Sequence, residues 1–330
     1  MAHTPHQMPP SVAAQCIAEL CLAHGITVGE QDLQLIVAGA SGRVVVRVTP
    51  GGQASGVLGV YWTADRADNN SFVPAAEGLA RCGIRVPRVL HYQALEHGCG
   101  VCLVDDLGSM DLLSLKGLCF EQLLPAYSSA LEQLAAFHRV QPDWPLQPEF
   151  DAAMYRWEQG YFAEHLLGRH LGMNAAGFTE SVAAQQVARF LESLPRVPVH
   201  RDFQSQNIML HEGQAWFIDF QGMRYGCAEY DVASLAFDPY MDLAPEHADK
   251  LLAVYEQYSG RSVDADVYYA CALQRMMQAL GAFANIGYNQ HRQWYLSLIP
   301  TGLNKLRHIA ARVTDGSPAH ALATWLLNHV

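Results

Sequence analysis

The sequence predicts an α+β fold in two parts, a small antiparallel sheet followed by a larger helical part. The chain has 330 residues, which is more than one ordinary domain needs. Short apolar runs separated by Gly and Pro turns come first, and long stretches with helical periodicity follow them. Half of the residues are hydrophobic, so both parts can form a core. We expect the first part to cover residues 1–104 and the second to cover residues 105–330.

The composition excludes several classes of partner. The net charge is −11 and no basic cluster is present, which argues against a nucleic-acid partner. No apolar run has the length of a membrane span, and the first residues lack the pattern of a secretory signal. The eight cysteines are dispersed, and the Cys-x-x-C at 99–102 has no second pair to complete a zinc site. We expect a cytoplasmic monomer or homodimer that acts on a small molecule, with no nucleic acid and no membrane as partner.

The first part is expected to contain a leading helix, five strands and one further helix. Apolar residues recur at helical spacing over residues 11–24, and Gly25 ends this helix. A second helix is expected over residues 71–81. The five strands are expected at 33–38, 44–49, 56–62, a segment that begins within 83–90, and 101–104.

A loop of small residues joins the first two strands. Backbone N–H groups in such a loop can surround the phosphates of a nucleotide. The same residues also suit an ordinary tight turn, since any hairpin can carry two glycines. Arg43, and Arg47 on the return strand, would supply positive charge to the phosphates or be solvated strand arginines. The candidate nucleotide-binding residues of this loop are Gly39, Ala40, Ser41, Gly42 and Arg43.

The second part begins after the fifth strand, where Asp105-Asp106-Leu107-Gly108 forms a polar link. Amphipathic stretches then predict a series of helices. These helices are expected over residues 120–140, 150–167, 177–194, 246–258, 263–284 and 293–313.

The most informative stretch reads His-x-Asp-x-x-x-x-Asn, with His200, Asp202 and Asn207 at its defined positions. An apolar run that ends at Asp219 follows it, and residues 211–214 suit a hairpin turn between the two. Two short antiparallel strands would then place Asn207 and Asp219 near the same end. The spacing predicts a loop carboxylate beside an amide and a second carboxylate.

Phosphoryl transfer uses this set of groups. We assign Asp202 as the base, or as the group that orients the attacking hydroxyl. Asn207 and Asp219 are assigned as ligands of Mg²⁺, which prefers oxygen. His200 would brace the catalytic loop, residues 199–207, through its ring nitrogens. The alternative is a surface hairpin with chance polar residues, but the motif followed by an Asp that closes an apolar strand is much rarer than the motif alone.

The segment His200–Asn207, together with Ile218-Asp219-Phe220-Gln221, resembles the aminoglycoside phosphotransferase and choline kinase-like family. The resemblance implies a two-lobe protein-kinase-like fold and transfer of the γ-phosphate of ATP, with Mg²⁺, to a small molecule. Phe220-Gln221 stands where protein kinases have Phe-Gly, which favours the small-molecule branch. The resemblance extends from about Leu33 to the end of the chain.

The same resemblance implies an ATP site under the loop 39–43 and against the link between the two parts. The residues whose backbone would bond the adenine edge are Val104, Asp105 and Asp106. One expected residue is missing, because the third strand carries no lysine to reach the phosphates. Glu77 occupies the usual acidic position on the next helix but has no lysine to meet. Either this branch binds ATP without that lysine, or the chain is a nucleotide-binding pseudokinase; the three intact motif residues favour the first.

Two further residues follow the Asp219 motif. The segment Glu229–Leu235 resembles a helix start of the family, and Asp231 is assigned a structural role. It would cap this helix and tie down the backbone of the catalytic loop. Arg224 would bind the transferred phosphate or an anionic group of the acceptor, which a bidentate guanidinium suits. The alternative for Arg224 is a surface salt bridge.

Two later segments indicate which class of acceptor molecule the chain uses. Residues 274–283 and 295–300 resemble the branch of anomeric sugar kinases that phosphorylate N-acetylmuramate and N-acetylglucosamine in cell-wall recycling. An N-acetyl sugar acid predicts an arginine and amide donors, which Arg224, Gln274 and Arg275 would supply. A cationic acceptor, such as an aminoglycoside or choline, instead predicts a pocket with several carboxylates.

Overall fold

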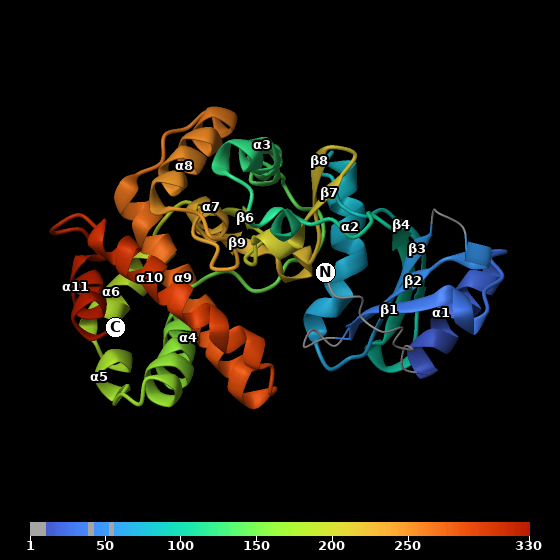
Figure 1. Cartoon of the computed structure of the whole chain (residues 1–330), viewed down its shortest axis with the longest axis horizontal. Coiled ribbons are helices and arrows are strands. Elements are labelled where there is room, and N and C mark those ends of the chain that lie inside the picture. The colour runs from blue at the N-terminus through green and yellow to red at the C-terminus, as the bar shows by residue number, and fades with distance from the viewer. Residues whose placement is uncertain (1–10, 39–42, 53–55) are drawn as a thin grey trace.

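The structure, a computed structural model, describes residues 11–38, 43–52 and 56–330. Figure 1 shows a small sheet at one end of the molecule and a larger group of helices at the other, which confirms the predicted α+β architecture. The predicted loop residues Gly39, Ala40, Ser41 and Gly42 lie outside the described residues.

The N-terminal part contains five antiparallel strands in the order β1–β2–β3–β5–β4. All five predicted strands are present: β1 (Leu33–Ala38), β2 (Arg43–Val48), β3 (Val57–Trp62), β4 (Val89–Ala94) and β5 (Gly100–Asp105). The register pairs Val45 with Val60 and Val60 with Cys102. These three apolar residues therefore lie side by side across the centre of the sheet.

Helix α1 (Ser11–Ala23) covers one face of this sheet. Its Ile17 belongs to a buried cluster with Val46 and Leu103. A Cβ at Gly59 would lie 2.5 Å from Cγ2 of Ile17, so glycine allows β3 to approach α1 closely. The opposite face of the central strands β3 and β5 belongs to the main core through Val60, Trp62, Cys102 and Val104.

Helix α2 (Phe72–Arg81) lies between the sheet and the helical part (Figure 1). At its first residue, the ring of Phe72 stacks on that of Phe220, with 5.4 Å between the ring centroids. This contact fixes the chain immediately after Asp219 against the N-terminal part.

The helical part is built around α9, which contacts α4, α7 and α10 and is buried along most of its length (Figure 1). No helix in the described part of the chain is both long and apolar enough to cross a membrane. The helices are α3 (Phe120–Phe137), α4 (Ala152–Phe162), α5 (Ala176–Thr179), α6 (Val182–Glu192), α7 (Ala228–Ala236), α8 (Pro245–Ser259), α9 (Ala265–Asn289), α10 (Ile299–Ala311) and α11 (His320–His329).

Local capping residues divide two helices that the periodicity predicted as continuous. The segment 177–194 is two helices, because Ser181 begins a new one by accepting a hydrogen bond from the N–H of Ala184 at 3.2 Å. The segment 293–313 begins with 3-10 turns, and α10 follows with Pro300 in its first turn, where a missing N–H is tolerated. Helix α11 lies beyond the last predicted helix.

Two small two-stranded sheets hold the catalytic loop. The predicted hairpin is confirmed, since Ile208 pairs with Phe217 and His211 with Gln214. The other sheet joins the strand before the loop to a strand that follows Asp219. The four strands are β6 (Val197–Val199), β7 (Ile208–His211), β8 (Gln214–Phe217) and β9 (Arg224–Gly226).

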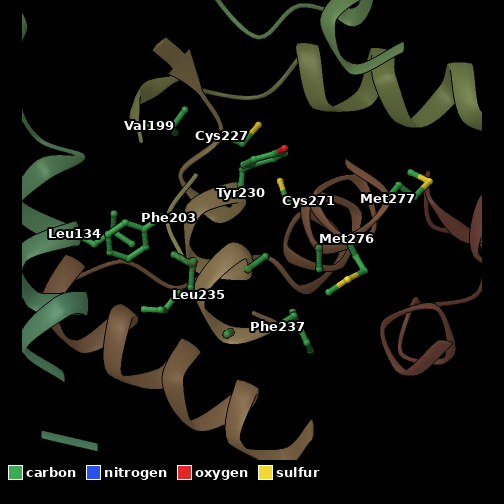
Figure 2. Packing of buried hydrophobic residues seen from close by; sticks show 14 of the residues in the cluster. Leu134, Val199, Phe203, Cys227, Tyr230, Leu235, Phe237, Cys271, Met276 and Met277 are labelled. Carbon is green, nitrogen blue, oxygen red and sulfur yellow. The ribbon is translucent and has the colours of Figure 1, made fainter. Parts of the chain in front are cut away.

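The catalytic loop is anchored in the main core by Phe203. Figure 2 shows this ring beside Leu134 of α3, and it belongs to the same buried cluster as Leu235 of α7 and Met276 of α9. The ring also packs edge-on against Phe217 of the hairpin, with 4.8 Å between centroids. Phe203 points into the core, and its packing therefore holds the neighbouring residues of the loop in place.

Candidate active site

A cavity of about 580 Å³ lies between the sheet and the helical part. The sheet contributes mainly apolar residues to it, namely Val45, Leu58, Val60 and Val104. The catalytic loop and the segment after β8 contribute Asp202, Gln204, Gln206, Asn207, Ile218, Asp219 and Phe220. Helix α9 and the segment after it contribute Arg275, Gln278, Ala279, Ala282, Phe283, Ile286, Arg292 and Tyr295. The sheet, the catalytic loop and α9 therefore border one continuous space.

Asp202 and Asn207 both line this cavity. The side-chain N–H of Asn207 donates to the backbone carbonyl oxygen of Asp202 at 2.8 Å, which closes the loop on itself. This bond leaves the amide oxygen of Asn207 without a partner among the described residues. The side chain of Asp202 is 37% exposed, so its carboxylate is open to a molecule in the cavity.

Asp231 holds the start of the catalytic loop. Its two carboxylate oxygens accept hydrogen bonds from the backbone N–H groups of His200, at 2.6 Å, and Arg201, at 2.9 Å. Arg201 has a φ of 78°, so this turn depends on an external support. The first part of the prediction for Asp231, that it caps the helix, is wrong: it is the fourth residue of α7, and its fully buried carboxylate caps the loop backbone instead of the helix.

A second buried carboxylate, Asp238, holds the middle of the loop and was not predicted. One of its oxygens accepts from the N–H of Ser205 at 2.7 Å, and the other from the N–H of Tyr240 at 2.9 Å. Asp238 follows Asp231 by seven residues, which is about two helical turns, and this spacing was the available signal. Together the two carboxylates fix three backbone N–H groups of the loop.

His200 connects the loop to the strand that leads to Asp219. Its Nε2 lies 2.9 Å from the carbonyl oxygen of Ile218 and therefore donates to it. Its Nδ1 is buried without a hydrogen-bond partner among the described residues. One ring nitrogen of His200 thus braces the loop, whereas the prediction from the sequence was that both ring nitrogens would do so.

Asp219 is bound by two side chains that point into the same region. The Arg43 guanidinium and the Gln221 amide both donate to its Oδ1, the latter at 2.9 Å. Arg43 also donates to the Gln221 amide oxygen at 3.0 Å, which completes a three-residue network. Although desolvation acts to raise the pKa of the Asp219 carboxyl, the charge of Arg43 and these hydrogen bonds lower it below its ordinary value.

The free oxygens of this site fit a hard cation. The Oδ2 of Asp219 and the amide oxygen of Asn207 have no partner in the described part of the chain. No cluster of three or more His, Cys, Asp or Glu side chains among those residues suits a metal. A cation here would take two protein oxygens and the rest of its ligands from phosphate and water, which is the coordination Mg²⁺ prefers.

The strand that lacks a lysine presents only apolar side chains to the cavity, those of Leu58 and Val60. Arg43 lies on the neighbouring strand and lines the cavity, whereas Arg47 points away to a bidentate pair with Asp106. Glu77 is exposed on α2. Of the two predicted cations, Arg43 is therefore the one that a phosphate in the cavity can reach.

The predicted adenine-binding residues divide into two groups. Val104 lines the cavity. Asp105 and Asp106 are not among its lining residues, and their carboxylates pair with Arg88, at 2.7 Å, and Arg47. These pairs stabilise the link between the two parts of the chain.

Arg275 is the predicted acceptor residue that reaches the cavity. Its Nε donates to Ser234 at 2.8 Å, and its Nη2 donates to the Gln204 side chain at 3.1 Å. Its Nη1 donates to Gln278 and lies 3.5 Å from Oδ1 of Asp202. The guanidinium is thus held in place beside the carboxylate assigned as base.

The other two predicted acceptor residues do not line the cavity. Gln274 is fully buried and donates to the Glu158 carboxylate at 3.0 Å, where burial raises the pKa of the Glu158 carboxyl. Arg224 is 5% exposed, with its guanidinium over the Phe150 ring and its Nε donating to the carbonyl of Gly222. Both support the protein core next to the site.

The matching sequences come from one family and one kind of activity. The profile of the phosphotransferase enzyme family matches residues 32–269. An N-acetylmuramate/N-acetylglucosamine kinase of Pseudomonas aeruginosa is 32% identical over 263 residues, which is 74% of each chain. A kinase of the same name from Neisseria meningitidis is 28% identical over 260 residues, 74% of this chain and 76% of its own.

The solved structures that resemble this one share its fold. A choline/ethanolamine kinase family protein from Mesorhizobium loti superposes with a TM-score of 0.60 at 15% identity, covering 96% of this chain and 99% of that chain. A thermostable mutant of the aminoglycoside phosphotransferase APH(4)-Ia gives a TM-score of 0.55 at 16% identity, covering 94% and 99%. The predicted two-lobe kinase-like fold is therefore confirmed.

Proposed function

Because this chain belongs to the phosphotransferase enzyme family, whose members transfer phosphate to a hydroxyl group, we propose that it is an ATP- and Mg²⁺-dependent kinase of an N-acetyl amino sugar. The acceptor we propose is N-acetylmuramate or N-acetylglucosamine, the substrates in the names of its relatives. The observation that carries this choice is the charge of the cavity. The only carboxylates among its described lining residues are Asp202 and Asp219, both assigned to the chemistry, while Arg275 and three glutamine amides line it as well.

In this proposal Asp202 accepts the proton of the acceptor hydroxyl, or orients that hydroxyl for in-line attack. Its backbone is fixed by Asn207, and Phe203 next to it is packed in the core. The guanidinium of Arg275 is held by contacts on three sides, and it in turn limits the movement of the Asp202 carboxylate. Preorganisation of this kind lowers the barrier because the catalytic group does not have to be reoriented during the reaction.

Asn207 and Asp219 would hold Mg²⁺ through the oxygens that have no protein partner. When bound, this ion would neutralise negative charge on the phosphates. Arg43 would take the place of the absent strand-three lysine as the cation next to the phosphates. Val45, Leu58, Val60 and Val104 would provide apolar contacts for the adenine ring.

The rival acceptor is cationic, an aminoglycoside or a choline-like amino alcohol. Recognition of such a molecule needs carboxylates in addition to the catalytic ones. The described residues that line the cavity supply none, and they include three arginines. The charge of the site therefore favours a neutral or anionic sugar.

ADP release with Mg²⁺-ATP tests the proposal across N-acetylmuramate, N-acetylglucosamine, other hexoses, choline and an aminoglycoside. We expect turnover of the two N-acetyl sugars, reduced by a factor of about 10² to 10⁴ in Asp202→Asn. Asp143→Asn, at a carboxylate that is 71% exposed and pairs with Arg81, is the matched control and should retain wild-type turnover.

Turnover confined to the cationic acceptors would refute the proposed substrate but not the phosphotransferase chemistry. ATP binding without turnover of any acceptor would identify the chain as the pseudokinase that the missing lysine suggested. Equal turnover in wild type and Asp202→Asn would refute the role of Asp202.

A further inference from the structure

The three arginines that line the cavity differ in how their guanidinium groups are used. Arg43 binds Asp219 and Gln221. Arg275 binds Ser234, Gln204 and Gln278. The side chain of Arg292 has no hydrogen bond or ion pair with any described residue, although it borders the same space. Its donors are therefore available to a molecule in the cavity.

The backbone of Arg292 is held at a defined position after the end of α9. His291 before it has a φ of 55°, which turns the chain. The N–H of Arg292 donates to the carbonyl of Ile286 at 3.4 Å, and its own carbonyl accepts from the N–H of Tyr295 at 3.0 Å. Arg292 is exposed and lines the cavity together with residues of α9.

Aromatic residues surround this position. Tyr295, Phe283 and Tyr240 line the cavity, and the Tyr240 ring stacks on the ring of Trp294 with 5.8 Å between centroids. Aromatic rings provide flat, rigid apolar area for the C–H face of a sugar. The combination of such a wall with an unpaired arginine suits a sugar that carries an acidic substituent.

We propose that Arg292 binds the carboxylate of an acidic acceptor and so sets the preference for N-acetylmuramate over N-acetylglucosamine, an inference that rests on the proposed function. The guanidinium offers two parallel N–H donors to a carboxylate, and a neutral sugar has no group that uses this pair as well. Arg275 cannot take this part, because its three donor nitrogens already have protein partners. Arg292 is thus a specificity residue and takes no part in phosphate transfer.

The test measures kcat/KM for both sugars, and KM for ATP, in wild type, Arg292→Gln and Arg292→Lys. We expect the preference for N-acetylmuramate over N-acetylglucosamine to fall roughly 10- to 100-fold in Arg292→Gln, through KM of the acidic sugar. Arg292→Lys keeps the positive charge but lacks the two parallel N–H donors. Its preference for N-acetylmuramate should therefore lie between those of wild type and Arg292→Gln. The matched control is Arg81→Gln, at an arginine that is 58% exposed and pairs with Asp143, and its preference should equal that of wild type.

An equal loss for both sugars would overturn the inference, because it would indicate a structural role. A rise in KM for ATP with an unchanged sugar preference would also overturn it and place Arg292 at the nucleotide. Calorimetric titration of each sugar into the protein loaded with ADP, which has no phosphate to transfer, gives a readout independent of turnover. If wild type phosphorylates neither sugar, the proposed function fails, and the titration still decides whether Arg292→Gln weakens binding of the acid alone.

Discussion

Gln274 and Arg275 are neighbours in the sequence, yet only Arg275 reaches the cavity. Successive residues of an α-helix point about 100° apart, so one of them faces Glu158 in the core and the other faces Asp202. The cavity-lining residues of α9 form a single stripe at helical spacing: 275, 278, 279, 282, 283 and 286. The sequence contains this stripe, but a helix that is buried on most sides gives no signal for which stripe borders the cavity.

Arg275 is expected to contribute to turnover by fixing the Asp202 carboxylate. Arg275→Met removes the cation 3.5 Å from Asp202 and leaves the Gln204 side chain without its donor, so kcat should fall roughly 10- to 100-fold. Ser234→Ala removes only the support of Nε and should lower kcat less. Steady-state kinetics with both substrates checks this.

The KM for ATP is the discriminating quantity in the Arg275 series. A positioning residue of Asp202 should leave it nearly unchanged, and Arg275→Lys should recover part of kcat. A rise in the KM for ATP that parallels the loss of kcat would mean that the substitution has disturbed the whole site.

The roles that could be predicted at this scale depend on local spacing. His200, Asp202 and Asn207 lie within eight residues, and their hairpin brings Asp219 to them with little dependence on the rest of the fold. Arg43 and Asp219 are 176 positions apart, and no local pattern connects them. The sequence could therefore suggest Arg43 as a cation near the phosphates, but its contact with Asp219 required the tertiary structure.

The elements of the sheet were predicted more accurately than the ends of the helices. Gly and Pro turns separate the strands, so each apolar run has clear limits. The helices of the second part are amphipathic over long stretches, and their ends depend on single residues such as Ser181 and Pro300. A hydrophobic pattern continues across such a residue, whereas the backbone hydrogen bonds do not.

Helices α4 and α9 pack closely, and replacing glycine by alanine is expected to change the free energy of unfolding in opposite directions at Gly281 and Gly160. A Cβ at Gly281 would lie 3.0 Å from the backbone N and Cα of Phe162, so Gly281→Ala should lower the free energy of unfolding by about 1–3 kcal/mol. A Cβ at Gly160 of α4 would meet no atom within 4 Å, so Gly160→Ala should raise it by about 0.5–1 kcal/mol. Urea denaturation of both variants measures the two changes.

The kinetics of the two glycine variants adds a second measurement. Helix α9 carries Arg275 and the rest of the cavity stripe, so a shift of α9 away from α4 should also change the KM of the acceptor in Gly281→Ala. Stabilisation by both substitutions would show that α4 and α9 can separate without cost, contrary to the packing described here.

At the scale of the whole molecule, one partly buried lysine connects the C-terminal helices to the candidate active site. The Nζ of Lys305, on α10, donates to the carbonyl oxygens of Asp238 and Met241, both at 2.7 Å. Asp238 in turn holds the N–H of Ser205 in the catalytic loop. Burial lowers the pKa of the Lys305 ammonium from 10.5 to about 8, so this connection depends on pH.

The sign of that dependence follows from proton binding. Above about pH 8 the folded chain has released the proton of Lys305, whereas the unfolded chain keeps it up to its ordinary pKa of 10.5. The contribution of Lys305 to the free energy of unfolding should therefore rise with pH in this window. Between about pH 8 and pH 10, the free energy of unfolding of wild type should rise by about 2 kcal/mol relative to that of Lys305→Met. Burial raises the pKa of the Cys21 thiol from 9.0 to about 11 and that of the Cys102 thiol from 9.0 to about 12, which opposes this trend above about pH 9. The comparison with Lys305→Met cancels that effect, because both proteins contain these thiols.

Lys305→Arg separates titration from hydrogen bonding at this position. Arginine keeps the donors to the two carbonyl groups but does not release a proton in proteins, so its unfolding free energy relative to Lys305→Met should lack the rise between about pH 8 and pH 10. Denaturant titrations of wild type, Lys305→Met and Lys305→Arg at several pH values provide the comparison. Parallel curves for all three would mean that Lys305 remains charged in the folded state, and its two carbonyl contacts would then have to compensate fully for its burial.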